Sequence, residues 1–406
     1  MPYMIRAITW ERSQEPLNIS PLRKRKKRMS DGFELSGLEK DLKKATMEEE
    51  IRGKRRIFTK ILIITFVTLI ALVLFGVGGV FILRTVGGRN LKQNVAGQTP
   101  KLSSGEGKIN TISENGDEWQ EDWIEYNGKT YAYNENILTF LVLGVDKDGE
   151  AVTSEDFASG GQSDGIFLVV CDPDKKHISC IAVNRDTMVP VKMSGAGLDG
   201  SDIIETAQIC TQYGFGDGGQ DSCLLVKDAV SALFYGLPIS GYASIRMTAI
   251  PAINDAVGGV SVTIPEDMTK AKSSWKEGSE VTLKGQDAYT FVRWRDRSKY
   301  ESARMRLLRQ KMYLSKVFVQ AKDETKENIS FPIDLYNSIS EYMVTDLSVS
   351  EVAYMASEYL GYAFNPDSDM IVLEGETKAG EKYEEFYPDE DKLKELMIEI
   401  FYKEVE

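Results

Sequence analysis

Three apolar runs in the first half of the chain carry charged residues at their ends. Asp146 closes the first run, Asp164 stands at the start of the second, and Arg185 and Asp186 follow the third. Buried strands have no structural need for charge at their ends, whereas ligand sites in α/β sheets gather there. Each of these residues alone could be a turn or capping residue, but the set together favours a binding site.

The two aspartates could form a metal site. If the first two runs are neighbouring antiparallel strands, Asp146 and Asp164 lie at the same edge of the sheet. Two close carboxylates repel each other unless a cation or a proton lies between them. Carboxylate oxygens suit Mg²⁺, which commonly bridges such groups to substrate phosphates. We therefore expect Mg²⁺ as the cofactor.

A second concentration of charge lies further along an otherwise acidic chain. The net charge of the 406 residues is −13, yet residues 291–310 contain six arginines. An acidic balance argues against nucleic-acid binding, which needs a basic surface. Arginine is a permanently charged, fork-shaped donor for carboxylates and phosphates. The cluster therefore serves a local anion, or else it is a solvated helix face. We interpret Arg297 and Arg304 as solvated or salt-bridged residues.

The spacing of the other basic residues in this stretch could make them converge. We predict a strand over residues 287–295, whose alternation places Arg293 and Arg295 on one face. A predicted helix follows, in which the i, i+3, i+4 spacing places three polar side chains on one face. These are Arg306, Arg309 and Gln310.

Histidine and cysteine chemistry is largely excluded. The only histidine, His177, lies in a polar turn, which argues against a catalytic triad and against a histidine-rich zinc site. The cysteines are Cys171, Cys180, Cys210 and Cys223, and none forms a CxxC motif. Cys171 and Cys180 lie on runs joined by a short turn, so a disulfide and buried free thiols are both compatible with the sequence.

An uncharged apolar run covers residues 61–83. At a rise of about 1.5 Å per residue, it is long enough to cross a hydrocarbon core of about 30 Å. It lies behind about 60 mostly polar residues, which argues against a cleaved signal peptide. Basic clusters at 23–28 and 52–56 precede it, and few cations follow. This asymmetry predicts a cytoplasmic basic tail, residues 1–60, and an external C-terminal part in a single-pass membrane protein.

The remaining chain predicts an α/β fold. Residues 84–122 read as a flexible stalk, and 123–133 as a hairpin around Asn127 and Gly128. The apolar runs 137–146, 165–172 and 178–183 are typical of strands buried on both faces. We expect further strands at 258–268 and 369–375. The pattern predicts helices at 220–235, 301–322, 350–361 and 389–404. This mixture predicts an α-β-α sandwich around a central mixed sheet. We divide it into a catalytic domain, 123–325, and a C-terminal α/β extension packed on it, 326–406.

Six pieces of the chain, taken in order, resemble the LytR-CpsA-Psr family. They are FLVLGVD (140–146), SDGIFLV (163–169), NRDTMVPV (184–191), DAVGGVSVTIPEDM (255–268), GQDAYTFVRWRDR (285–297) and RLLRQKMYL (306–314). The resemblance covers about residues 137–320. One piece alone would be weak, but six in sequence behind a single apolar span are specific.

The resemblance implies a function. Members of this family resemble phosphotransferases that move a glycopolymer, such as teichoic acid or capsular polysaccharide, from undecaprenyl pyrophosphate to a hydroxyl of peptidoglycan. They act at the outer face of the membrane, and their α/β sandwich has a hydrophobic tunnel for the polyprenyl chain.

The resemblance also implies roles for residues. Asp146 and Asp164 would hold Mg²⁺, and Asp186 would help to activate the acceptor. The catalytic set would be Arg185, Asp186, Arg293, Arg295 and Arg306. The pyrophosphate ligands would be Arg185, Arg293, Arg295, Arg306 and Gln310, with Arg309 added from its helix face.

The chain departs from the family pattern near these positions. Lys147 is the nearest cation after the first aspartate, where the family commonly has an arginine. Gln162 stands where an arginine commonly precedes the second aspartate, and Asn184 replaces a proline. Ala303 stands where an acid is common, with Glu301 as the nearest carboxylate.

Two other functions remain compatible with the sequence. The same residues could hydrolyse a polyprenyl pyrophosphate with water as the acceptor. Alternatively, the smaller number of cations near the two aspartates could mark a non-enzymatic protein of the cell envelope, which binds polyprenyl lipids or has a regulatory role.

Overall fold

The computed structural model describes most of the chain after the predicted membrane span. The described residues are 84–102, 123–154, 160–197, 200–296, 298–300 and 302–405, with Lys40, Lys43, Lys44 and Met47 upstream. The chain divides into two compact units, Met1–Phe75 and Gly76–Glu406, and the architecture below belongs to the second. No helix within the described part is long and apolar enough to span a membrane. The predicted span, 61–83, lies outside that part.

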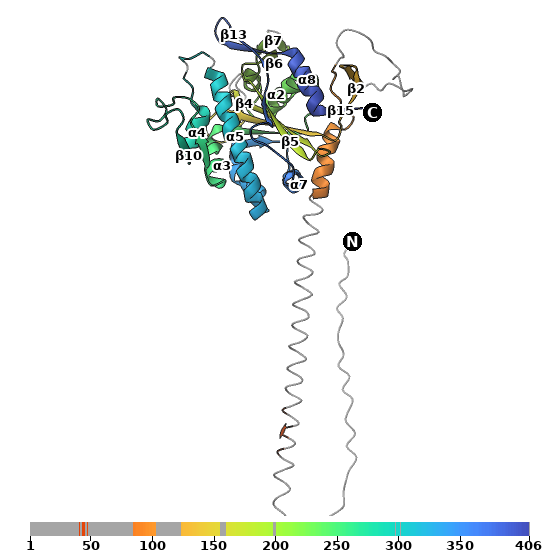
Figure 1. Cartoon of the computed structure of the whole chain (residues 1–406), viewed down its shortest axis with the longest axis vertical. Helices are drawn as coiled ribbons and strands as arrows, with labels where there is room; N and C mark the ends of the chain where they lie inside the picture. The colour runs from red at the N-terminus through yellow and green to blue at the C-terminus, as the bar shows by residue number, and fades with distance from the viewer. Residues whose placement is uncertain are drawn as a thin grey trace, which may run out of the picture. The chain divides into compact units, whose positions relative to one another are not determined.

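A six-stranded mixed sheet forms the centre of the domain (Figure 1). Its order is β11-β8-β3-β4-β5-β12, where the strands are β3 (Leu138–Val145), β4 (Ser163–Asp172), β5 (His177–Val183), β8 (Gly241–Arg246), β11 (Met343–Thr345) and β12 (Met370–Val372). The neighbours β3 and β4 are antiparallel, as are β4 and β5, whereas β8 is parallel to β3 and β12 is parallel to β5. The three apolar runs are therefore adjacent strands, as their composition predicts.

Helices cover both faces of this sheet. The helices are α2 (Gln220–Leu233), α3 (Ile250–Ala256), α4 (Gln286–Arg293), α5 (Ser302–Glu327), α6 (Phe331–Ile339), α7 (Val349–Tyr359) and α8 (Glu390–Phe401). On one face Leu143 of β3 shares an apolar cluster with Val230 of α2 and Met397 of α8. On the other face Phe167 of β4 clusters with Leu307 of α5. The α-β-α sandwich with a central mixed sheet is thus confirmed.

Residues after about 325 complete the central sheet. Both edge strands, β11 and β12, come from this part of the chain. The predicted C-terminal α/β extension therefore supplies both edges of the sheet whose centre lies in residues 123–325.

The smaller strands form four further sheets. They are β1 (Trp123–Tyr126), β2 (Lys129–Tyr133) and β15 (Tyr402–Glu404) in one sheet, and the pairs β6 (Met188–Met193) with β7 (Ile203–Gln208), β9 (Val260–Thr263) with β10 (Glu280–Leu283), and β13 (Gly375–Ala379) with β14 (Glu384–Pro388). Asn127 and Gly128 both have positive φ, which is the backbone that a tight hairpin turn needs. Cys171 and Cys180 are buried free thiols, so the disulfide alternative does not hold.

The stretch 287–295 is not a strand. Residues Gln286–Arg293 form helix α4, which buries Ala288, Phe291 and Val292. These three positions follow the i, i+3, i+4 spacing of a helix face, although the aromatic and β-branched composition favours a strand. Tertiary burial of that face outweighed the local preference. The prediction that strand alternation places Arg293 and Arg295 on one face is therefore wrong.

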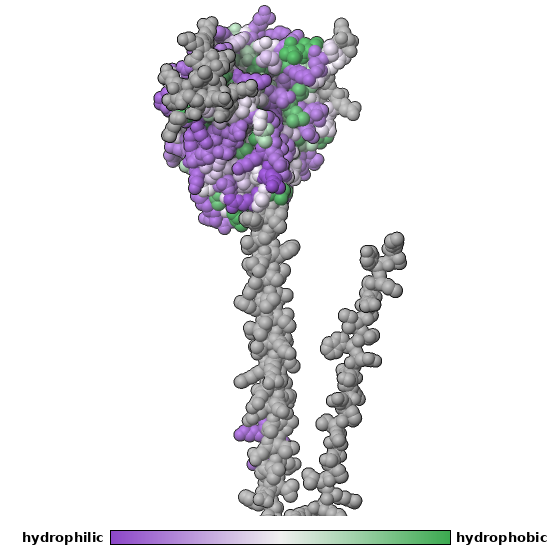
Figure 2. Space-filling view, turned by 90° about the vertical axis from the view of Figure 1, so that its right-hand side faces the viewer, coloured by the Kyte–Doolittle hydropathy of each residue, from purple (hydrophilic) through white to green (hydrophobic). Residues whose placement is uncertain are grey.

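A helix over residues 84–95 packs against the domain, where we predicted the start of a flexible stalk. Leu91 is fully buried in a cluster that includes Phe140. A side chain at Gly87 would lie 2.2 Å from the Ser350 carbonyl oxygen, so glycine permits the close approach to α7. Figure 1 draws this helix in orange beside α7. On the face shown in Figure 2, hydrophilic residues cover most of the domain and hydrophobic residues form separate spots.

Candidate functional site

The two strand-end aspartates lie at the same edge of the sheet. Val145 of β3 pairs with Ser163 of β4, and the Asp146 amide donates to the Gln162 carbonyl oxygen at 2.9 Å. Asp146 directly follows Val145, and Asp164 lies between Ser163 and Gly165 at an irregularity in the pairing, so both acids lie at this edge of two antiparallel strands, as the sequence predicts. Both side chains are paired with arginines.

Asp164 is the most enclosed acid of the site. Its side chain is 3% exposed, and it lies 2.5 Å from Nη1 of Arg185 and 2.7 Å from Nη1 of Arg306. Two guanidinium groups thus share one carboxylate, and Arg185 also lies 3.3 Å from Asp186. Burial lowers the pKa of Arg306, only partly offset by Asp164, and Nη2 of Arg306 is buried with no hydrogen-bond partner among the described residues. An anion placed here would supply the missing partner.

Arg293 and Arg295 reach different parts of the site. Arg293, the last residue of α4, lies 2.8 Å from Asp146. Arg295 donates from Nε to the Ser302 hydroxyl at 2.7 Å, and its Nη2 lies 3.7 Å from Glu384. The structure therefore brings both arginines to the same region, but each has its own carboxylate.

Arg309 and Gln310 hold the end of α4. Arg309 is 1% exposed, and it donates to the carbonyl oxygens of Phe291 and Trp294 and to Glu266. Burial lowers its pKa to about 10, with Glu266 opposing the shift. Gln310 donates to the Val292 carbonyl oxygen at 3.3 Å. The last carbonyls of a helix need such donors, so these residues cap α4 and position Arg293, and Arg309 has no donor directed at a ligand.

Asp186 has the environment of a general base. It is 4% exposed, accepts a hydrogen bond of 2.8 Å from Gln208 Nε2, and lies 3.3 Å from Nε of Arg185. Burial raises the pKa of Asp186, against the opposing charges of nearby arginines and with a contribution from Glu384. A carboxylate with a raised pKa is a better proton acceptor than an ordinary aspartate.

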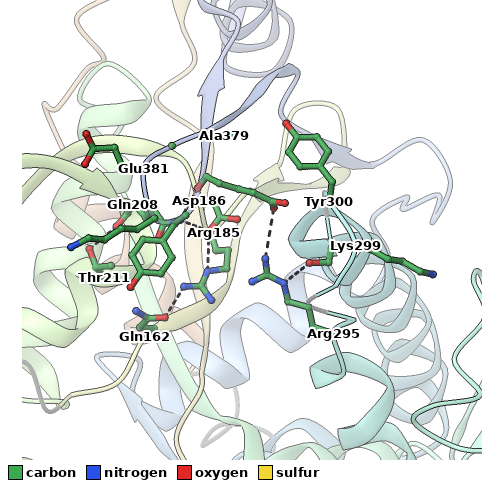
Figure 3. Close-up of a pocket in the computed structure, with 15 residues that line it drawn as sticks. Gln162, Arg185, Asp186, Gln208, Thr211, Arg295, Lys299, Tyr300, Ala379 and Glu381 are labelled. Carbon is green, nitrogen blue, oxygen red and sulfur yellow. Dashed lines mark hydrogen bonds and ion pairs between the residues drawn. The ribbon is translucent and has the colours of Figure 1, made fainter.

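A polar cavity of about 660 Å³ opens beside Arg185, Asp186 and Arg295. Figure 3 shows the guanidinium groups of Arg185 and Arg295 entering it from different elements, with Gln162 within reach of Arg185. The other lining residues are Gln208, Thr211, Lys299, Tyr300, Ser302 and the segment 379–384 of the β13–β14 hairpin. These residues were not predicted from the sequence, because no spacing or motif links that hairpin to the strand ends.

Cys210 was also missed, and it lies within the site. Its sulfur accepts a hydrogen bond of 2.7 Å from Nη2 of Arg185. Burial raises the pKa of Cys210 to about 12, despite the opposing charge of Arg185. The group is therefore a neutral thiol near pH 7, which excludes a role as a thiolate nucleophile.

Two apolar cavities follow α5 away from the charged groups. The first, of about 110 Å³, includes Gln310 and Val317; the second, of about 340 Å³, includes Phe318 and Thr325 and is also lined by α6 and α7. From Gln310 to Thr325 an α-helix rises about 22 Å. The first apolar cavity thus reaches Gln310, one turn from Arg306, and the second is a separate cavity lined by residues further along the same helix.

Asp146 and Asp164 are the acids expected to hold Mg²⁺. Among the described residues, no group of three or more histidine, cysteine, aspartate or glutamate side chains could hold a metal. Asp146 and Asp164 each have a buried Oδ1 without a well-aligned hydrogen bond, although each lies near a guanidinium. Mg²⁺ is often bound by one or two carboxylates together with substrate phosphates and water.

Sequence comparison gives the family. The profile of the LytR_cpsA_psr family matches residues 102–399, well over half of the chain. The chain is 26% identical over 245 residues to the polyisoprenyl-teichoic acid–peptidoglycan teichoic acid transferase TagU of Bacillus cereus, covering 60% of this chain and 71% of that protein. It is 27% identical over 255 residues to TagU of Halalkalibacterium halodurans, covering 63% and 75%.

Comparison with solved structures agrees on the fold. The crystal structure of TagV from B. subtilis has a TM-score of 0.50 at 21% identity, covering 65% of this chain and 96% of that one. Protein gbs0355 of Streptococcus agalactiae also has a TM-score of 0.50, at 20% identity, covering 65% and 87%. Together with the strand-end acids and the arginines around them, the family match shows that this chain belongs to the LytR-CpsA-Psr family.

Proposed function

We propose that the protein transfers a glycopolymer from a polyprenyl-pyrophosphate carrier to a hydroxyl of peptidoglycan. The observation that carries the proposal is the placement of Asp164 between Arg185 and Arg306, because this contact holds Arg306 with its buried Nη2 left without a hydrogen-bond partner among the described residues, as an anion-binding donor would be. The TagU relatives, which bear the name of teichoic acid transferases, support the same reaction class. The glycopolymer is of the teichoic acid or capsule type.

The donor fits the sequence of environments along α5. Its pyrophosphate would lie among Arg185, Arg293 and Arg306, and its polyprenyl chain would enter the apolar cavities beyond Gln310. Mg²⁺ on Asp146 and Asp164 would neutralise charge on the pyrophosphate when bound.

Positioning and charge stabilisation suffice for this reaction. The oxygen of the acceptor hydroxyl attacks the phosphorus that carries the glycan, and a new P–O bond forms. The bond between this phosphorus and the bridging oxygen breaks, and polyprenyl phosphate leaves. Asp186 accepts the hydroxyl proton, and the guanidinium groups of Arg185 and Arg306 stabilise the charge on the departing phosphate.

The reaction belongs at the outer membrane face. The apolar run 61–83 is the proposed single span, with the basic residues before it in the cytoplasm and the folded domain outside. Peptidoglycan and the lipid-linked donor are the proposed partners, and the net charge of −13 argues against nucleic acid.

The test is transfer by the purified full-length protein in lipid nanodiscs. A labelled lipid-linked oligosaccharide serves as the donor and a peptidoglycan oligosaccharide as the acceptor. We expect the label to become covalently attached to the acceptor. Release of the label into water alone, at the same rate with and without acceptor, would instead identify a hydrolase.

A further inference from the structure

The β13–β14 hairpin lies directly against the proposed base. The Phe386 amide donates to the Asp186 carbonyl oxygen at 2.8 Å. Gln208 Nε2 lies 2.8 Å both from Oδ1 of Asp186 and from the carbonyl oxygen of Glu384, so one amide joins the base to the hairpin. The Tyr300 hydroxyl donates to the Thr377 carbonyl oxygen at 2.9 Å from the other side. The hairpin is thus a fixed wall of the cavity.

The Glu384 side chain faces the cavity, whereas its neighbour faces away. Glu384 lies on the same side of β14 as the buried Phe386, lines the cavity, and is within 3.7 Å of Arg295. Strand alternation places Glu385 on the opposite side, where its carboxylate accepts a hydrogen bond from the Tyr387 hydroxyl at 2.7 Å. The two adjacent glutamates therefore differ in their access to the site.

The lining of the polar cavity suits a polyhydroxylated ligand. The cavity presents the carboxylate of Glu384, the amide of Gln208, the hydroxyl of Thr211 and the rings of Tyr300 and Tyr383. Carboxylates and amides bind sugar hydroxyls by hydrogen bonds, and aromatic side chains offer apolar faces with a polar edge. Acidic and basic groups are mixed here, so the polar cavity does not select for a simple anion.

The in-line geometry of phosphoryl transfer indicates which sugar binds here. In phosphoryl transfer the attacking and leaving oxygens lie roughly in line on opposite sides of the phosphorus. The leaving polyprenyl phosphate lies toward the apolar cavities along α5, so the attacking hydroxyl approaches from the polar side, next to Asp186. Resting on the proposed function, we propose that the β13–β14 hairpin forms the binding subsite for the acceptor saccharide, with Glu384 as a hydroxyl-binding residue.

The first test measures binding without any donor. A peptidoglycan tetrasaccharide is titrated against the full-length protein in nanodiscs, and saturation-transfer NMR gives its Kd. Because a hydrogen bond to a charged group contributes about tenfold or more to affinity, Glu384→Gln is expected to weaken binding by about tenfold, and Glu385→Gln to leave it unchanged. Tyr383, which is 69% exposed, provides a second variant, Tyr383→Ala, that does not threaten the fold.

The second test separates the acceptor from the donor glycan. Initial rates are measured with the concentrations of both substrates varied. Glu384→Gln and Tyr383→Ala are expected to raise the KM for the acceptor by about tenfold and to change the KM for the donor less. A rise confined to the donor KM would assign the wall to the donor glycan and overturn the proposal. Equal affinity of wild type and both variants for the tetrasaccharide would also overturn it. If the wild type binds the tetrasaccharide but transfers nothing to it, the proposed function fails while the subsite stands.

Discussion

Arg306, in the first turns of α5, donates a hydrogen bond of 2.7 Å to Asp164, which lies 142 residues earlier at the start of β4. Both side chains are buried, and Arg185 pairs with the other carboxylate oxygen. The contact joins the helix along which the apolar cavities lie to the sheet edge that carries the acids. It therefore links the proposed lipid path to the proposed chemistry.

Asp164→Ala is expected to reduce kcat/KM for transfer by at least about 100-fold, because both arginines lose the group that orients them. Breaking a buried ion pair also costs about 3–5 kcal/mol in the free energy of unfolding. Steady-state transfer assays and chemical denaturation of the same preparations measure the two effects. Asp228→Ala is the matched control, since this residue is exposed on α2, and the variant should retain wild-type transfer and stability. Full transfer by Asp164→Ala would contradict the role of this carboxylate.

Arg309→Lys is expected to impair positioning rather than remove a ligand for the donor. A lysine cannot reproduce the planar fork that joins the Phe291 and Trp294 carbonyl oxygens to Glu266, so the end of α4 loosens. We expect a lower Tm and a raised donor KM, and the donor KM should recover in part at reduced temperature. The exposed Lys316 of the same helix supplies the control, Lys316→Ala. An unchanged Tm with a lost activity would instead make Arg309 a direct ligand.

The pH profile of kcat/KM should report Asp186. Its base form is needed, and burial raises its pKa, so activity should fall with decreasing pH at a higher pH than for an ordinary aspartate. Arg185, Arg295 and Arg306 oppose that shift, and Glu384 adds to it. Removing the charge of Arg295 in Arg295→Gln should therefore move the acidic limb to higher pH.

The opposite shift is expected for Glu384→Gln, because it removes a negative charge near the same group. Full pH profiles of wild type and both variants distinguish this from a general loss of activity. Acidic limbs that coincide in all three proteins would exclude Asp186 as the titrating base.

Gly87→Val should detach the helix over residues 84–95 from α7. The added atoms would meet the Ser350 carbonyl oxygen, and such overpacking costs about 1–3 kcal/mol. Limited proteolysis of the full-length protein should then cleave this segment faster than in wild type. Val86→Ala, at a residue that is 46% exposed, should leave the cleavage rate unchanged. Equal protection in both variants would mean that the packing at Gly87 does not hold the helix.

The sequence predicts the central layer well, because buried strands have an unmistakable composition. The runs around Phe140, Phe167 and Ile181 became adjacent strands, and the pairing of β3 with β4 brought Asp146 and Asp164 to one edge. Local alternation failed at Arg293 and Arg295, since the burial of α4 depends on contacts that are distant in sequence.

The site itself depends on long-range contacts that no local pattern encodes. Arg306 and Arg309 are three positions apart on α5 and were expected to share one helix face. Arg309 nevertheless caps α4, whereas Arg306 pairs with Asp164. Gln162, where the family commonly has arginine, accepts a hydrogen bond of 2.6 Å from Arg185. A neutral amide thus orients a site arginine here, and only the tertiary structure reveals it.

The central claim is that these charges act on a lipid-linked pyrophosphate. The most direct measurement is covalent attachment of a labelled, lipid-linked oligosaccharide to peptidoglycan by the full-length protein in nanodiscs, with wild type compared with Asp164→Ala and Arg293→Ala. The account predicts attachment by wild type and attachment at least about 100-fold slower by either variant, with all three proteins folded by circular dichroism. Attachment by both variants at the wild-type rate, or none by the wild type in the presence of Mg²⁺, would contradict it.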